Sequence, residues 1–195
     1  MADAPLTPER ILETSEHVLR RYGPAKATVV DVARELGVSH GSVYRHFPSK
    51  AALRDAVAER WLAAVADPLA AIANEDGAAA ERLRRWLDLL VSSKQDRARD
   101  DPELFATYVE IAGQSREVIT EHVDGLVAQL ARIIADGIEQ GVFVATDAHA
   151  AARAVFDATA RFHNPANSAS WADPRIAADY EQVISLILAG LSARA

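Results

Sequence analysis

The sequence contains no cysteine among its 195 residues. This absence excludes disulfide bonds, thiolate metal sites and a cysteine nucleophile, and it is typical of a reducing compartment, so we expect a cytoplasmic protein. No window approaches about 20 uncharged apolar residues, so no membrane-spanning helix is expected. The first residues include an acid and a proline where a basic start and an apolar run would be needed, so no signal peptide is expected either.

The net charge of −7 is unevenly distributed along the chain. Residues 1–60 hold nine basic and eight acidic side chains, whereas residues 61–195 hold twelve and twenty. A whole-chain charge of this sign argues against contact with DNA or anionic lipid, but the first part is close to neutral. The asymmetry indicates two regions with different partners, although a solvated surface with local bias gives the same pattern.

Helix-forming residues dominate the composition. Alanine makes up about a fifth of the chain, and alternating β-branched residues are scarce. We therefore predict an all-α protein with about nine helices. The first four helices follow the N-cap candidates Thr7, Thr28, Ser39 and Ser49. They are expected to end at Gly23-Pro24, Gly37, Pro48 and Asp67-Pro68. Further helices are expected at 78–97, 102–113, 115–140, 147–162 and 174–192, with a loop from Asn164 to Asp173.

Residues 28–50 have the pattern of a helix-turn-helix. Two short helices meet at Gly37, where glycine permits the left-handed backbone of a tight turn. On the second of these helices, Val43 and Phe47 face the core, so Gly41 and Arg45 point outward. The outward face carries hydroxyls, histidines and a guanidinium but no carboxylate. This chemistry suits a surface that approaches phosphates and base edges.

Two residues of this segment fit poorly with a purely structural role. Glycine inside a helix costs about 1 kcal/mol relative to alanine, so Gly41 is better explained by the close approach of a partner. Lys50 lies at a helix start, where the helix dipole disfavours a cation, as expected if its charge serves a phosphate. Ordinary surface exposure explains any one of these residues, but it explains the whole set less well.

The segment from Thr28 to Lys50 closely resembles the DNA-binding signature of TetR-family transcriptional regulators. Its distinctive part is Val43-Tyr44-Arg45-His46-Phe47-Pro48-Ser49-Lys50, and the resemblance covers about residues 7–66. It implies a DNA-binding domain at 1–50, continuing into a joining helix at 49–66, and an effector-binding and dimerisation domain at 51–195. Two departures are Val30, where relatives often carry a polar or basic residue, and His40, which leaves the preferred base undetermined.

The resemblance implies specific contacts with double-stranded DNA. The residues that it assigns to phosphates are Thr28, Tyr44, His46 and Lys50. Those that it turns toward base edges are His40, Gly41 and Ser42, with Arg45 as an addition. Ser39 contributes the amide-rich start of the recognition helix, which favours anions.

The resemblance also implies a homodimer that pairs through its last two helices and reads a pseudo-palindromic operator. Small residues on the first of these helices permit close approach, and a wide apolar stripe marks the second. The candidate interface residues are Ala151, Ala152, Val155, Ala158, Tyr180, Val183, Ile184, Ile187, Leu188 and Leu191. Periodicity alone favours a core role for both stripes, so the dimer interpretation depends on the resemblance.

The acidic second region is expected to bind a small-molecule effector. Aromatic side chains with a few polar groups suit such a pocket. The candidates are Trp86, Phe105, Tyr108, Gln114, His122, Phe156, Phe162 and His163. Each of them is also explained by an ordinary core position, and a protonated His163 would cap the last carbonyls of its helix.

We therefore predict a non-enzymatic, ligand-responsive repressor that uses no cofactor and leaves its operator when an effector binds. The segment from Gly113 to Glu117 lacks the second glycine and the preceding strand of a nucleophile elbow. No phosphate loop, dinucleotide fingerprint, HExxH or EF-hand spacing occurs. The alternatives are a metal-responsive regulator of the same fold, built from histidines and acids, and a helical enzyme or scaffold.

Overall fold

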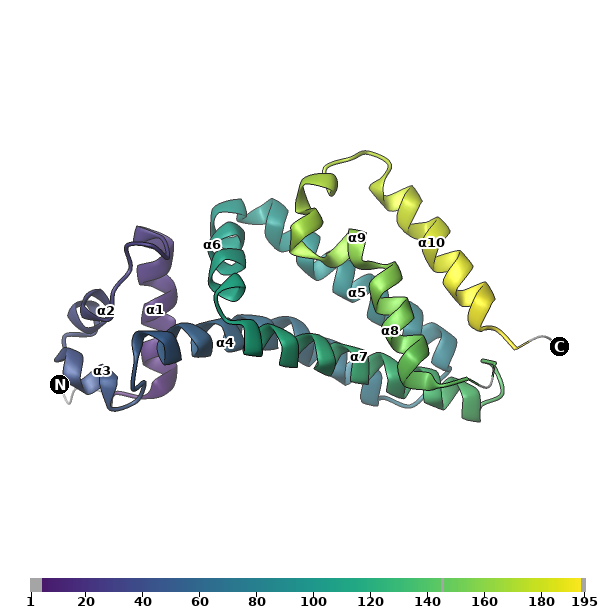
Figure 1. Cartoon of the computed structure of the whole chain (residues 1–195), viewed down its shortest axis with the longest axis horizontal. Coiled ribbons are helices and arrows are strands. Elements are labelled where there is room, and N and C mark those ends of the chain that lie inside the picture. Colours follow the sequence, from purple (N-terminus) through teal and green to yellow (C-terminus); the bar gives the residue numbers. More distant parts are fainter. Residues whose placement is uncertain (1–4, 145, 194–195) are drawn as a thin grey trace. The chain divides into compact units, whose positions relative to one another are not determined.

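The computed structural model describes residues 5–144 and 146–193. Over these residues it contains ten α-helices and one 3-10 helix, and it has no β-strand beyond an isolated bridge between Phe143 and Ser192 (Figure 1). The all-α prediction is confirmed. The chain divides into two compact units. The first unit takes in the described residues up to Ala63 together with Asp101–Thr120, and the second takes in Ala64–Asp100 and the described residues from Glu121 onward. The functional boundary predicted after residue 50 stays a prediction, because compact units and functional domains need not share their limits.

The first unit is built around the helix-turn-helix. It contains α1 (Pro8–Tyr22), α2 (Val29–Leu36), α3 (His40–Tyr44), the start of α4 (Lys50–Asn74) and α6 (Pro102–Gly113) (Figure 1). The apolar residues at helical spacing form a small core of their own. Its most deeply buried members are Ile11, Val18, Val32, Ala33 and Val43.

The predicted capping residues of the first unit all act as caps. Thr28 and Asp31 form a reciprocal capping box, and Gly37 adopts the left-handed conformation with φ 70°. The Ser49 Oγ accepts a hydrogen bond from the amide of Ala52 at 3.0 Å. One boundary differs, because α3 ends at Tyr44 and not at Pro48. Arg45 and His46 therefore lie in the turn that follows the helix.

The fourth helix was predicted to end at Asp67-Pro68, and this prediction is wrong, because α4 continues to Asn74. A proline inside a helix removes the amide that would bond to the carbonyl four residues earlier, here that of Ala64. In the structure Arg97 donates to this carbonyl at 3.2 Å. The replacement donor comes from a distant part of the sequence, so the local pattern around Pro68 contains no sign of it.

The second unit surrounds a larger apolar core. It contains the later part of α4, α5 (Ala79–Asp100), most of α7 (Arg116–Glu139), α8 (Ala148–Ala158), α9 (Ala160–His163), a 3-10 helix (Pro165–Ser170) and α10 (Ile176–Leu191) (Figure 1). The single helix predicted at 147–162 is interrupted at Thr159, whose hydroxyl donates back to the carbonyls of Val155 and Phe156. The predicted loop after Asn164 contains the 3-10 helix.

Candidate nucleic-acid interface and effector region

The recognition helix α3 is held at its start by serine hydroxyls. The Ser39 Oγ accepts from the amide of Ser42 at 3.2 Å and lies 2.9 Å from the Ser42 Oγ. Arg45 donates to the Ser42 hydroxyl at 3.2 Å. Through these bonds the Arg45 guanidinium lies beside the start of α3.

The outward orientation predicted for this face agrees with the structure. Val43 is fully buried, whereas the Tyr44 side chain is 41% exposed and lies edge-on to the His40 ring. Of the nine candidate DNA contacts, Ser42 is half-buried, and those exposed to solvent are Thr28, Ser39, His40, Gly41, Tyr44, Arg45, His46 and Lys50. The structure thus brings the candidates to one accessible segment, and their individual contacts with DNA stay predictions.

The Thr28 hydroxyl is already engaged within the protein. It donates to Asp31 Oδ2 at 2.6 Å, and the Thr28 amide donates to the same carboxylate at 3.1 Å. These hydrogen bonds, followed in effect by the Arg34 guanidinium, hold the pKa of Asp31 below its usual value. The carboxylate is therefore ionised at neutral pH and fixes the start of α2.

Three of the predicted effector residues belong to the first unit. Phe105 and Tyr108 lie on α6 and contact Trp61 of α4, which stacks on Tyr108 with a centroid distance of 4.8 Å. The Gln114 side chain accepts a long hydrogen bond of 3.4 Å from Arg54. This grouping of Phe105 and Tyr108 with Trp61 was not visible in the sequence, because it joins helices about 45 residues apart.

The other five predicted effector residues lie in the second unit. Trp86 is fully buried and donates to Gln129 at 3.0 Å. His163 packs against Phe156 at 4.7 Å between ring centroids, and its Nε2 lies 3.2 Å from the Phe156 carbonyl oxygen. Phe162 contacts the ring of Tyr180. His122 holds a buried Nε2 that has no hydrogen-bond partner among the described residues.

Lys94 on α5 was not among the residues predicted from the sequence. This lysine is only 5% exposed, and burial lowers its pKa to about 8. A signal was available, since Lys94 follows Leu83, Leu87 and Leu90 along the apolar face of a helix. The charge of Lys94 lowers the pKa of both His122 and His163, so the three side chains lie near one another in the second unit.

The half-buried His122 and the buried His163 are both neutral at pH 7. Burial, with a further effect of the Lys94 charge, lowers the pKa of His122 to about 4. Burial likewise lowers the pKa of His163 to about 4, partly opposed by its contact with the Phe156 carbonyl. The interpretation of His163 as a protonated helix cap is therefore wrong, because the charged form is disfavoured in this buried position.

We expect the protein to lose stability as the pH falls from about 6.5 to about 4. Both histidines bind protons more tightly in the unfolded chain than in the folded protein, so protonation in this pH window favours unfolding. At neutral pH neither state is protonated at these residues, and this loss of folding stability is absent. Each histidine is expected to contribute about 1–2 kcal/mol. Urea unfolding across this range should show a weaker acid loss in His122→Met, whereas the exposed His149→Gln should match the wild type. Equal pH profiles in all three proteins would contradict the assignment.

The predicted dimer residues divide into two groups. Those buried against their own chain are Ala152, Val155, Tyr180, Ile184 and Leu191. Those still accessible, at least in part, are Ala151, Ala158, Val183, Ile187 and Leu188. Leu186, which was not predicted, has 74% of its surface exposed on α10. A single exposed apolar side chain is common on protein surfaces, so the interface stays a prediction.

No helix in the described part of the chain is long and apolar enough to cross a membrane. Within residues 5–144 and 146–193, no three His, Asp or Glu side chains are grouped closely enough to hold a metal ion.

Two family models match the chain. Residues 11–57 match the model described as bacterial regulatory proteins, tetR family. Residues 79–184 match the tetracyclin repressor-like C-terminal domain, and this match covers more than half of the chain. The first match contains α2, α3 and their turn, and the second contains most of the larger core.

Individual relatives agree with these models. The nucleoid occlusion factor SlmA of Vibrio vulnificus (strain YJ016) is 34% identical over 85 residues, which cover 43% of this chain and 43% of that protein. The match thus spans less than half of the length of this curated relative. SmeT, the repressor of the Stenotrophomonas maltophilia multidrug efflux pump SmeDEF, has the same fold, with a TM-score of 0.69 and 19% identity over 98% of this chain and 93% of that chain. A transcriptional regulator from Saccharomonospora viridis in complex with choline gives a TM-score of 0.66 and 23% identity over 96% of this chain and 98% of that chain.

Together with the helix-turn-helix geometry, the two family models show that this chain belongs to the TetR family of DNA-binding transcriptional regulators.

Proposed function

We propose that this protein is a ligand-responsive repressor that binds a pseudo-palindromic operator as a homodimer. The observation that carries the proposal is the exposed face of α3, which presents His40, Gly41 and Ser42 with no carboxylate on it. Such a face approaches the polyanionic groove without charge repulsion. The acidic excess lies in residues 61–195, so nonspecific DNA affinity should be low at physiological salt.

The proposed DNA contacts have two roles, because some position the protein on the phosphates and others recognise the bases. Tyr44, His46 and Lys50 are proposed to hold phosphates, which fixes the register of α3 without reading the sequence. Thr28 is proposed to act through the amides that it caps at the start of α2, because its own hydroxyl and amide already donate to Asp31. His40, Gly41 and Ser42 are proposed to face base edges, with Arg45 beside them, held by the Ser42 hydroxyl. Two identical α3 helices in a dimer would then read two half-sites in successive major grooves.

The second unit is proposed to hold the effector and the dimer interface. The choline complex of the related regulator supports a small-molecule ligand in this fold, although the choline belongs to that protein. Here the effector region is proposed to contain His122, Phe156 and His163. The accessible residues of α8 and α10, with Leu186 among them, are proposed to meet a second copy of the chain. An effector that prefers one spacing of the two α3 helices would release the operator.

Gly41→Ala separates a recognition role from a purely structural role. An added Cβ would meet only the Ser39 Oγ at 3.8 Å, and alanine is the better helix former, so folding stability should stay level or rise slightly. If α3 lies against a groove, the methyl group should lower operator affinity about tenfold. DNA sites selected by the full-length protein from a random library, followed by anisotropy titration, measure this affinity and the expected ratio of two chains per operator.

Gly125→Ala on α7 is the matched control, because its Cβ meets no atom within 4 Å and the residue lies outside the first unit. It should bind DNA as the wild type does. Unchanged affinity in Gly41→Ala would remove Gly41 from the interface. Absence of any salt-sensitive, sequence-preferring DNA binding by the folded wild type would overturn the proposed function.

A further inference from the structure

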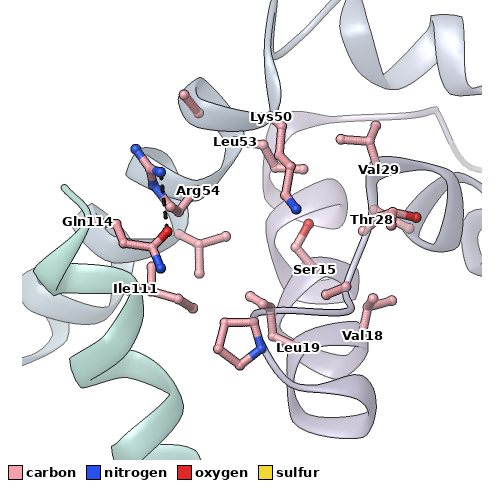
Figure 2. Close-up of a pocket in the computed structure, with 15 residues that line it drawn as sticks. Ser15, Val18, Leu19, Thr28, Val29, Lys50, Leu53, Arg54, Ile111 and Gln114 are labelled. Carbon is pink, nitrogen blue, oxygen red and sulfur yellow. Dashed lines mark hydrogen bonds between the residues drawn. The ribbon is translucent and has the colours of Figure 1, made fainter.

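The first unit contains a pocket for which the proposed function assigns no ligand, although Thr28 and Lys50, which line it, are also proposed DNA contacts. Figure 2 shows this pocket, a cavity of about 210 Å³ bounded by residues of α1, α2, α4 and α6. Its apolar wall includes Val18, Val32 and Val57, which are at most 3% exposed. Because these side chains are buried in the interior, folding fixes the position of this wall. Apolar cavities of about 150 Å³ bind a molecule the size of benzene, so this volume suits a small organic molecule.

The polar part of the lining is cationic and hydroxylic. Ser15, Thr28, Lys50, Arg54 and Gln114 line the cavity, and no carboxylate is among the lining residues. Most of these groups already have partners. The Ser15 hydroxyl donates to the Ile11 carbonyl at 2.7 Å, and the Arg54 guanidinium pairs with Asp55 at 3.0 Å. The charge of Arg54 is therefore largely compensated before any ligand arrives.

Lys50 differs from the other polar lining residues. In Figure 2 its side chain extends into the pocket, with the nitrogen toward Ser15. No hydrogen bond or ion pair within residues 5–144 and 146–193 involves its ammonium group. The group also lies in the first turn of α4, where the helix dipole repels a cation. A cation at the mouth of an apolar cavity without an acidic partner favours an anion with an apolar body.

We propose that this pocket binds a small monocarboxylate with a compact apolar body, and that Lys50 pairs with its carboxylate. A single uncompensated cation matches one negative charge, whereas a phosphate dianion would need further donors. The apolar wall takes the hydrocarbon part, and the small volume excludes long acyl chains. This site lies in the first unit and is distinct from the proposed effector region of the second unit.

The proposed site has a consequence for DNA binding that depends on the proposed function. Lys50 is a proposed phosphate contact, and an ammonium paired with a carboxylate inside the pocket is not available to DNA. Ligand and operator would therefore compete for the same side chain, without a conformational change in the second unit.

Binding is tested on the full chain without DNA, so the result does not depend on the proposed function. Isothermal titration with hexanoate should give saturable binding of one molecule per chain. The neutral 1-hexanol, which has the same apolar body, should bind at least tenfold more weakly. Equal affinity for hexanoate and hexanol would overturn the role of the charge, and the absence of saturable hexanoate binding would overturn the site.

Variants locate the binding within the chain. Lys50→Met keeps the length and apolar stem of the side chain and should weaken hexanoate binding about tenfold, whereas Lys50→Arg should retain it. Lys26→Met is the matched control, because Lys26 is exposed in the same unit and does not line the pocket. Ala27→Leu, which fills a lining position, should abolish binding. Hexanoate affinity that is unchanged in both Lys50→Met and Ala27→Leu, while both proteins unfold cooperatively, would place the ligand elsewhere and overturn the proposal.

Discussion

Gly137→Ala is expected to destabilise the folded protein by about 2–3 kcal/mol. Gly137 lies on α7, and a Cβ at this position would come within 2.9 Å of Cγ of Phe143 and closer still to Cδ2 and Cε2. The Phe143 ring is only 3% exposed, so it has no open space into which it can move. The amides of Val142 and Phe143 both donate to the Gly137 carbonyl at 3.0 Å, which holds the returning chain against the helix.

The measurement is chemical unfolding followed by circular dichroism at 222 nm. Gly125→Ala on the same helix is the matched control, because its Cβ meets no atom within 4 Å. This control should be neutral or stabilised by up to about 1 kcal/mol, as expected for alanine in a helix. If Gly137→Ala unfolds at the same denaturant concentration as Gly125→Ala, then the Phe143 ring does not pack on Gly137 as described.

The helix-turn-helix could be predicted in detail because its determinants are local. A cap, a turn glycine and an apolar pair at helical spacing all lie within residues 28–50, and the structure places Thr28, Gly37 and Val43 as expected. The predicted end of α3 at Pro48 is wrong, because the helix ends at Tyr44. A proline excludes helix at the residue before it but does not extend a helix up to that point. Local signals therefore predicted helix starts better than helix ends.

Features that depend on distant residues could not be predicted in the same way. α4 continues through Pro68, and the carbonyl that the proline leaves without an amide accepts from Arg97 of α5. The pocket of the first unit combines residues from α1 to α6. The hydrophobic periodicity of the sequence indicates neither this cavity nor the inward direction of the Lys50 side chain. Burial of Lys94 was indicated by its apolar neighbours, yet a lysine at the end of an apolar stripe is usually able to reach solvent.

Arg82→Met is expected to cost about 3 kcal/mol of folding stability. Arg82 is 3% exposed, and its guanidinium donates to Asp136 at 2.8 Å and to the carbonyls of Ile72 and Ala73 at 3.3 and 2.7 Å. These two carbonyls belong to the last turn of α4, which has no further helical amides to satisfy them. Methionine fills much of the same space but leaves the carbonyls and the Asp136 carboxylate without their donor.

Arg85→Met on the same helix is the matched control. Arg85 also forms an ion pair, with Glu75, but its side chain is 54% exposed, so the loss should be within about 0.5 kcal/mol. Arg82→Lys tests the geometry, because an ammonium retains the charge but lacks the planar fork that reaches three oxygens, and it should recover only part of the stability. Urea unfolding of the three variants measures these differences. Equal losses in Arg82→Met and Arg85→Met would mean that the bonds of Arg82 to the end of α4 contribute no more than a surface ion pair.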